Sequence, residues 1–273
     1  MGSPIAETWV HATMFITNEW HRCGTGFLVE RHVDPERLKI FLATNKHVVH
    51  GDPARRRAAG YLRLGVNVRD EHGAVAGAEF TVDMQNPPGQ RWREHPDPHV
   101  DVLAIDVTDM FVNNPQIAAK RAAYSVFADT PVLEEHDITI GDEVLVVGYP
   151  LGIAQGATNF PLVRQGIIAS KIGETLHHRR RDGTSAILRA FLVDCGLVPG
   201  SSGSPVILKP SPARLVKGDL VLGGEAPFYL LGIVAETEVA SVGEGAEEFR
   251  ALAGLGLAFD APTIRETIET FFE

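Results

Sequence analysis

Short runs of β-branched, aromatic and other apolar residues recur along the whole chain, and clusters of Gly, Pro, Asp and Asn separate them. Such runs are typical of strands, and their spacing rarely leaves room for the helices of parallel βαβ units. The pattern therefore predicts an all-β protein built as a pair of barrels. The runs of the first half are Trp9–Ile16, Gly26–Val29, Ile40–Thr44, Gly60–Val68, Ala78–Val82 and Val100–Val107. Those of the second half are Glu143–Gly148, Val163–Ser170, Ala186–Val193, Pro205–Leu208, Phe228–Ala235 and Gly256–Phe259.

A less regular segment between Asp109 and Asp129 divides the chain into two halves. We place an N-terminal barrel at residues 5–115 and a C-terminal barrel at residues 130–260, within a single domain of residues 1–273. Residues 261–273 show helical spacing of apolar residues, and a proline stands near their start. Proline is favoured in the first turn of a helix, so this segment is predicted to be a C-terminal α-helix.

The chain carries a formal net charge of -10 over 273 residues, which disfavours binding to nucleic acid or to anionic lipid. One basic stretch, His177–Arg181, stands beside an Asp-Gly pair between two apolar runs, and it is predicted to be a solvated hairpin tip. No apolar run reaches the roughly 18 residues of a membrane span. We therefore expect neither a nucleic-acid nor a membrane partner.

The cellular location is predicted from two features of the sequence. The N-terminus lacks the basic and then apolar sections of a secretory signal. Cys23 and Cys195 are the only cysteines, too few for a disulfide framework. Both features predict a cytoplasmic protein.

The strongest chemical signal is the segment Gly200–Pro205, which reads Gly-Ser-Ser-Gly-Ser-Pro and precedes an apolar strand. A serine on such a turn allows two backbone N–H groups, its own and that of the residue two positions earlier, to point at one place. This arrangement stabilises the oxyanion of a tetrahedral intermediate. Glycine at the earlier position permits the required backbone geometry.

Three serines in this segment compete for the role of nucleophile. Two positions before Ser201 stands Pro199, which has no N–H to donate. Ser204 precedes Pro205, which restricts it to extended backbone. Ser202 has Gly200 at the donor position, so we predict Ser202 as the nucleophile and Gly200 and Ser202 as the oxyanion donors.

A nucleophilic serine needs a basic histidine, and that histidine needs an acceptor that orients its ring. His47 directly follows an apolar strand run, and Asp101 stands at the mouth of another. Asp106 is the rival carboxylate at the far end of that run. Because successive side chains of a strand alternate between its faces, Asp101 and Asp106 are predicted to face opposite ways. The candidate triad is His47, Asp101 and Ser202.

With these motifs the chain resembles the chymotrypsin-like (trypsin-like, clan PA) serine peptidases, and most of all the HtrA-type protease domain without a PDZ domain. The resemblance covers nearly the whole chain. The matching segments are Gly24–Phe27, Thr44–Val49, Asp101–Ile105, Gly148–Gly152, Gln165–Ser170, Asp194–Pro205 and Gly254–Phe259. It implies two perpendicular six-stranded antiparallel β-barrels, with His47 and Asp101 on the first and Ser202 on the second.

The resemblance also implies where substrate binds. The floor of the primary specificity pocket falls on Gly196 and Leu197, where no carboxylate stands, and the substrate-pairing strand falls on Ile233, Val234 and Ala235. A basic substrate residue would lack a counter-ion there, so small or medium aliphatic residues are predicted before the cut. Glu236 follows on the same strand and would bring a carboxylate to the edge of the pocket.

The expected activity is that of a serine endopeptidase acting on protein or peptide substrates without a metal or other cofactor. The alternative is a catalytically weak or inactive binding module on the same fold, because fold alone does not establish activity. Neither His177-His178 nor His95–His99 has the spacing that zinc sites commonly show. By analogy with the family, a regulatory partner or oligomer is possible, with Thr175–Ser185 as the regulatory loop.

Overall fold

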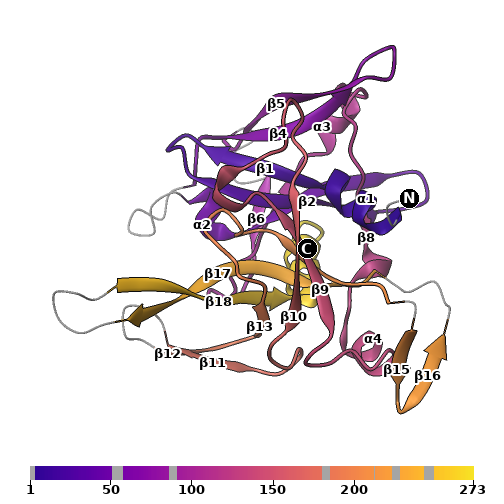
Figure 1. Ribbon diagram of the computed structural model, residues 1–273. Helices are drawn as coiled ribbons and strands as arrows, with labels where there is room; N and C mark the ends of the chain where they lie inside the picture. Colours follow the sequence, from indigo (N-terminus) through magenta and orange to yellow (C-terminus); the bar gives the residue numbers. More distant parts are fainter. Residues whose placement is uncertain are drawn as a thin grey trace.

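The computed structural model of the protein describes residues 4–50, 58–85, 91–179, 185–211, 213–222, 228–242 and 249–273. Figure 1 shows two β-rich halves, with the first half of the chain in indigo and purple above the second half in magenta to yellow. Within the described ranges, none of the helices has the length and apolar character needed to cross a bilayer. The all-β class with two barrel halves and a C-terminal helix is confirmed.

The first half is an eight-stranded sheet rather than the six strands that the resemblance implied. Its neighbouring strands run in the order β5-β4-β1-β2-β3-β7-β6, and β8 pairs with β2 in parallel. The two strands added to the expected set, β6 and β8, are three and two residues long. The strands are β1 (Thr13–Asn18), β2 (Cys23–His32), β3 (Leu38–Thr44), β4 (Tyr61–Arg69), β5 (Val75–Asp83), β6 (Trp92–Glu94), β7 (Leu103–Asp106) and β8 (Ala122–Ala123).

The second half is a closed six-stranded barrel in the order β10-β13-β18-β17-β14-β9. All of its neighbouring strands are antiparallel. Two hairpins, β11 with β12 and β15 with β16, form separate two-stranded sheets. The strands are β9 (Glu143–Gly148), β10 (Leu162–Ile168), β11 (Leu176–Arg179), β12 (Ser185–Leu188), β13 (Ala190–Asp194), β14 (Pro205–Leu208), β15 (Ala213–Val216), β16 (Asp219–Leu222), β17 (Leu230–Val242) and β18 (Phe249–Asp260).

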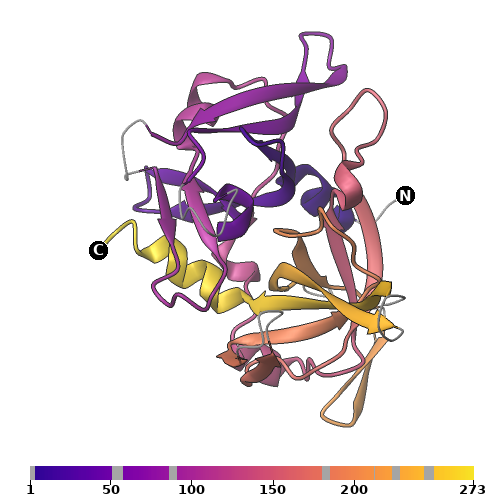
Figure 2. The same ribbon diagram turned by 90° about the vertical axis from the view of Figure 1, so that its left-hand side faces the viewer.

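Short helices connect and cover these strands. They are α1 (Pro4–Ala12), α2 (Lys46–Val49), α3 (Thr108–Asn113), α4 (Thr130–Glu135) and α5 (Ala261–Glu269), with 3₁₀ turns at Tyr124–Val126 and Pro150–Gly152. The C-terminal helix α5 contacts β6 and β7 of the first half as well as β17 and β18 of the second. Figure 2 shows α5, in yellow, leaving the second barrel and lying beside the first.

Three of the predicted elements are wrong in their bounds. The strand expected from Trp9 begins only at Thr13, because the preceding residues form the end of α1, where Trp9 packs edge-on against Phe27 at 5.9 Å. The run Ala186–Val193 is divided at Arg189 into two strands of different sheets. The run Val100–Val107 contains only the short strand β7. The tip of the hairpin predicted at His177–Arg181 lies partly outside the described residues.

Three clusters of buried side chains form the core. One fills the first half and another fills the second. The third lies between the halves, where Trp9, Phe27 and Phe41 of the first half join buried residues of the second half and of α5, among them Ile233, Phe259 and Ile264. Burial of this shared apolar surface holds the two halves together.

Candidate active site

The chain brings His47 and Asp101 together on the first half. His47 lies in the short helix α2, directly after β3 ends, and Asp101 lies in the loop before β7. Asp101 Oδ2 lies 2.5 Å from His47 Nδ1, and its Oδ1 accepts a hydrogen bond from the His47 backbone N–H at 3.2 Å. Asn45 Nδ2 donates to the Asp101 carbonyl at 2.7 Å. The aspartate is therefore held by both its side chain and its backbone, and it orients the imidazole.

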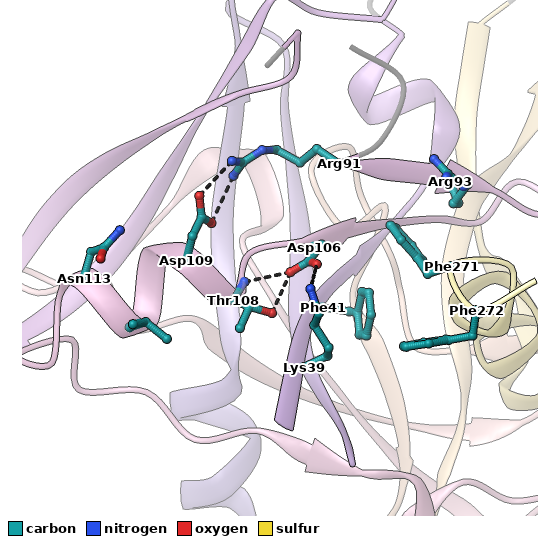
Figure 3. Close-up of a pocket in the computed structure, with 11 residues that line it drawn as sticks. Lys39, Phe41, Arg91, Arg93, Asp106, Thr108, Asp109, Asn113, Phe271 and Phe272 are labelled. Atoms are coloured by element: carbon teal, nitrogen blue, oxygen red, sulfur yellow. Dashed lines mark hydrogen bonds and ion pairs between the residues drawn. The ribbon is translucent and has the colours of Figure 1, made fainter. Parts of the chain in front are cut away.

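Asp106, the rival carboxylate, lies elsewhere, but strand alternation is not the reason, because Asp101 precedes β7 instead of belonging to it. Its Oδ2 pairs with Lys39 Nζ at 2.6 Å, and its Oδ1 accepts hydrogen bonds from Thr108. These groups line a cavity of about 690 Å³ beside α3 and the C-terminal phenylalanines, where Arg91 and Asp109 form a second ion pair at 2.7 Å (Figure 3). None of the predicted site residues lines this cavity, so the candidate site is not located there.

The nucleophile loop makes a tight turn before β14 in the second half. Gly200 and Gly203 both have a positive φ, at 91° and 86°, a conformation that side chains rarely adopt. A Cβ atom on Gly203 would overlap the carbonyl oxygen of Thr25 in β2. The Thr25 N–H also donates to the Ser202 carbonyl at 2.8 Å. This loop is thus built directly against the first half.

The hydrogen bonds of the loop leave two N–H groups for the predicted oxyanion position. The N–H groups of Ser201, Gly203 and Ser204 donate to other backbone carbonyls. Among the described residues, none of the recorded hydrogen bonds uses the N–H of Gly200 or of Ser202. These are the two N–H groups that the sequence predicts as oxyanion donors.

A neighbouring turn sets the orientation of the Gly200 N–H. The Pro199 carbonyl accepts a hydrogen bond from the Leu151 N–H at 2.8 Å. In a planar trans peptide the carbonyl and the next N–H point in opposite directions. The Gly200 N–H therefore points away from Leu151, a residue that is itself held at a φ of 56°.

The three candidate serines differ in their exposure. Ser201 and Ser204 are buried, at 2% and 0% exposed, whereas Ser202 is partly exposed. The Ser202 hydroxyl donates to the Ala235 carbonyl at 2.9 Å. Because a hydroxyl has one hydrogen, that hydrogen must leave the Ala235 carbonyl before a base can take it.

The residues predicted to bind substrate lie beside the nucleophile loop. Their backbone meets it directly, since Val234 exchanges hydrogen bonds with Gly203 and Ser204. The side chains of Leu197, Ile233, Val234 and Ala235 belong to the buried core, each at most 1% exposed. Gly196, at a φ of 54°, accepts a hydrogen bond from Arg164 through its carbonyl. The side chain of Glu236 lies outside what the structure describes.

Thr25 is a site residue that sequence reasoning missed. Its hydroxyl donates to the Gly200 carbonyl at 3.0 Å and accepts the Tyr149 N–H at 3.1 Å, so one side chain joins both segments around the oxyanion position. The available signal was the motif Gly24-Thr25-Gly26. A Cβ on either glycine would crowd a buried side chain, Val48 for Gly24 and Ile16 for Gly26.

Candidate metal ligands are not gathered anywhere in the described parts of the chain, where no group of three or more His, Cys, Asp or Glu residues is suitably placed. Both nitrogens of the His95 ring are within hydrogen-bond distance of other groups, Asp97 N and Glu266 Oε2. Cys23 and Cys195 are free thiols.

Comparison with known proteins gives the family of the chain and the structures that share its fold. The trypsin-like peptidase domain matches residues 24–211. The comparison with curated proteins gives no match. Among solved structures, an inactive form of Rv3671c from M. tuberculosis H37Rv aligns with a TM-score of 0.50 and 17% identity, covering 99% of this chain and 91% of that one. Deg5 aligns with a TM-score of 0.50 and 13% identity, covering 97% and 90%.

At these identities the solved structures show a shared fold, whereas the domain match spans most of the sequence, including all three predicted triad positions. The predicted resemblance to chymotrypsin-like (trypsin-like) serine peptidases is confirmed by the domain match, and the solved structures share the fold. The chain belongs to the trypsin-like peptidase family.

Proposed function

We propose that this protein is a serine endopeptidase in which Ser202 is the nucleophile, His47 the general base and Asp101 the group that orients His47. The observation that carries the proposal is the bond of 2.5 Å between His47 and Asp101 on one half. Ser202 lies on the other half and is the partly exposed serine of its turn. In the described structure, the N–H groups of Gly200 and Ser202 in this turn donate to no backbone carbonyl.

The proposed reaction is acyl transfer in two steps. Ser202 attacks the substrate carbonyl while His47 takes the hydroxyl proton, and the N–H groups of Gly200 and Ser202 stabilise the oxyanion. His47 then returns the proton to the leaving amine, and water releases the acyl group from Ser202. The reaction requires the Ser202 hydroxyl hydrogen to leave the Ala235 carbonyl, which a rotation of the O–H group accomplishes.

The proposed substrate is a protein or peptide with a small or medium aliphatic residue before the cut. Gly196 supplies no carboxylate, and the Arg164 guanidinium donates to the Gly196 carbonyl. A Lys or Arg side chain bound there would meet a cation instead of a counter-ion, which is costly in a desolvated pocket. A cytoplasmic location is also proposed, because the two cysteines are unpaired.

The second candidate is a weak or inactive binding module on the protease fold. The observation that favours it is the hydrogen bond of 2.9 Å from the Ser202 hydroxyl to the Ala235 carbonyl. Any regulatory partner or oligomer would then act by shifting Ser202 between the two arrangements.

Labelling with a fluorophosphonate probe distinguishes the two candidates. We expect the wild-type protein to be labelled and to cleave peptides, because an activated serine reacts with the probe. Ser202→Ala should abolish labelling and lower turnover by at least about a thousandfold with the fold retained, and His47→Ala should act similarly. Ser201→Ala is the matched control from the same loop and should retain labelling. Equal labelling of wild-type and Ser202→Ala protein would contradict the proposed function.

A further inference from the structure

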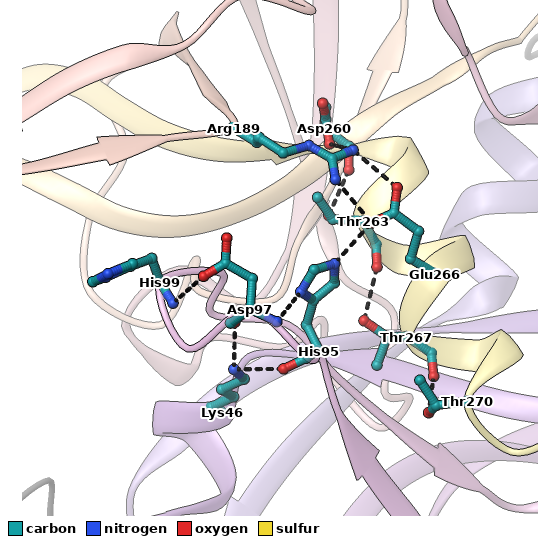
Figure 4. A network of polar contacts seen from close by, with 10 residues as sticks. All are labelled: Lys46, His95, Asp97, His99, Arg189, Asp260, Thr263, Glu266, Thr267 and Thr270. Atoms are coloured by element: carbon teal, nitrogen blue, oxygen red, sulfur yellow. Dashed lines mark hydrogen bonds and ion pairs between the residues drawn. The ribbon is translucent and has the colours of Figure 1, made fainter. Parts of the chain in front are cut away.

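A polar network joins the loop that carries Asp101 to the C-terminal helix (Figure 4). His95 is buried, at 6% exposed, and its Nδ1 accepts the Asp97 N–H at 3.0 Å. Nδ1 therefore carries no hydrogen in this arrangement, and the hydrogen of the neutral ring is on Nε2. Nε2 lies 3.0 Å from Glu266 Oε2 of α5, so His95 donates to this carboxylate.

Glu266 also binds the second half of the protein. Its two carboxylate oxygens accept hydrogen bonds from Arg189 at 2.8 and 3.0 Å, and Arg189 lies between β12 and β13. Burial opposes ionisation of Glu266, but the hydrogen bonds from Arg189 and His95 lower its pKa overall. An ionised Glu266 thus connects a residue of each half through charge-assisted hydrogen bonds.

The same loop is held from its other side by the residue next to His47. Lys46 Nζ donates to the carbonyls of His95 and Asp97, at 3.1 and 3.2 Å. Lys46 and His47 are consecutive residues of α2. The segment from His95 to Asp97 therefore lies between the helix that carries the proposed base and the helix that carries Glu266.

Little conformational freedom separates this anchored segment from Asp101. Pro96 and Pro98 each restrict φ to a narrow range. The Val100 N–H donates to the Asp97 carbonyl at 3.2 Å and so closes the turn. A displacement of the anchor is therefore passed on to Asp101 instead of being absorbed along the loop.

We propose that Glu266 is a positioning residue for the triad, acting through His95 to hold Asp101 against His47. This inference rests on the proposed function, since it concerns the same triad. The hydrogen bonds of Glu266 join it to His95 and Arg189. Its role is to couple the angle between the two halves, through Arg189, to the loop that orients His47.

The test compares two glutamates of the same helix in the full-length protein. Glu266→Gln leaves one amide oxygen for the several N–H donors of His95 and Arg189. Glu269→Gln is the matched control, because Glu269 lies three residues later and pairs with Arg31 through two hydrogen bonds of 2.8 and 2.7 Å. We expect Glu266→Gln to lower kcat roughly tenfold with KM nearly unchanged, because small misplacement of a catalytic group slows chemistry more than binding. Glu269→Gln should stay within about twofold of wild type.

A second measurement requires no turnover. The proton on His47 Nδ1, which bridges to Asp101, gives a distinct low-field NMR signal when the bond is short. This signal should shift or broaden in Glu266→Gln and stay as in wild type in Glu269→Gln.

A rescue variant separates positioning from simple loss of packing. His95→Gln retains an N–H near the position of Nε2 and should recover part of the kcat lost in His95→Ala. Combining His95→Ala with Glu266→Gln should lower kcat no further than either change alone, because both substitutions break the same hydrogen bond between His95 and Glu266.

The outcomes are distinguishable from failure of the proposed function. If Ser202→Ala is labelled like wild type, the proposed function fails, and the NMR comparison still decides the role of Glu266. If Glu266→Gln and Glu269→Gln have the same kcat and the same His47 signal, the positioning role is overturned even in an active protease.

Discussion

Replacing Asp260 by Asn is expected to stabilise the protein at neutral pH, although it removes a charge next to an arginine. Asp260 is the last residue of β18 and precedes α5. Its side chain is only 12% exposed, and Arg189 approaches no closer than 3.7 Å, too far for a hydrogen bond. Its Oδ1 has no hydrogen-bond partner in the described structure. This carboxylate is therefore buried with little compensation.

The size of the effect follows from the pKa of Asp260. Burial raises this pKa from an ordinary value of 3.8 to about 6, and the attraction of Arg189 only partly opposes the rise. A tenfold change in proton affinity corresponds to about 1.4 kcal/mol, so this difference corresponds to about 3 kcal/mol. Because the folded state holds the proton more tightly, the free energy of unfolding falls as pH rises from about 4 to about 6. The destabilisation by the buried Asp260 charge is therefore absent below about pH 4 and complete above about pH 6.

Urea unfolding at pH 4 and pH 8 measures this penalty. Asp260→Asn should match wild type at pH 4 to within about 1 kcal/mol and exceed it by about 3 kcal/mol at pH 8, because Asn has nearly the shape of the protonated acid and carries no charge. Asp129→Asn is the matched control. Asp129 caps α4 through the Val132 N–H with a half-exposed side chain, and its replacement should change stability by less than about 1 kcal/mol at both pH values. If Asp260→Asn were less stable than wild type at pH 8, attraction to Arg189 would outweigh burial.

Two further outcomes test the nucleophile loop and the pocket. Gly203→Ala should destabilise the protein by more than about 3 kcal/mol, because its Cβ would overlap the Thr25 carbonyl. Gly218→Ala should cost only about 1 kcal/mol in chemical denaturation, since Gly218 shares the positive φ but faces open space. Equal losses would show that backbone strain, and not the close approach of the halves, is what Gly203 avoids. In a peptide library, cleavage should follow small or medium aliphatic residues, and predominant cleavage after Lys or Arg would refute the pocket assignment around Gly196.

The strands were predictable wherever alternation and turn residues agreed with the final packing. The run Ile40–Thr44 lies within β3, and Pro205–Leu208 coincides with β14. Prediction failed where distant contacts override local preference. Trp9 has a strong strand preference, yet it lies within α1, where its ring is buried against Phe27. The predicted strand Ala186–Val193 is divided at Arg189, which binds Glu266. Local sequence does not show this division, because Glu266 lies far along the chain.

The candidate site shows the same division. The sequence was enough to propose His47, Asp101 and Ser202, because serine-peptidase chemistry requires these three residue types and each stands in a characteristic local motif. The hydrogen bond of the Ser202 hydroxyl could not be predicted, because its acceptor is the carbonyl of Ala235 in another part of the chain. The two hydrogen bonds of the Thr25 hydroxyl could not be predicted either, because each partner is more than a hundred residues away in the sequence.

Different forces hold the two halves together and align them. Burial of the shared core around Phe27 and Phe259 is non-directional, so it favours association over a range of angles. Hydrogen bonds weaken steeply as their geometry departs from linearity, and they restrict that range. Thr25 makes such bonds on the side of the nucleophile loop, and the proposed link through Glu266 makes them on the side of Asp101. Since the proposed triad draws residues from both halves, its geometry depends on these few directional contacts, whereas stability depends mainly on the core. Stability and turnover are therefore separable in this protein, and the glutamates at positions 266 and 269 are the pair in which that separation is measured.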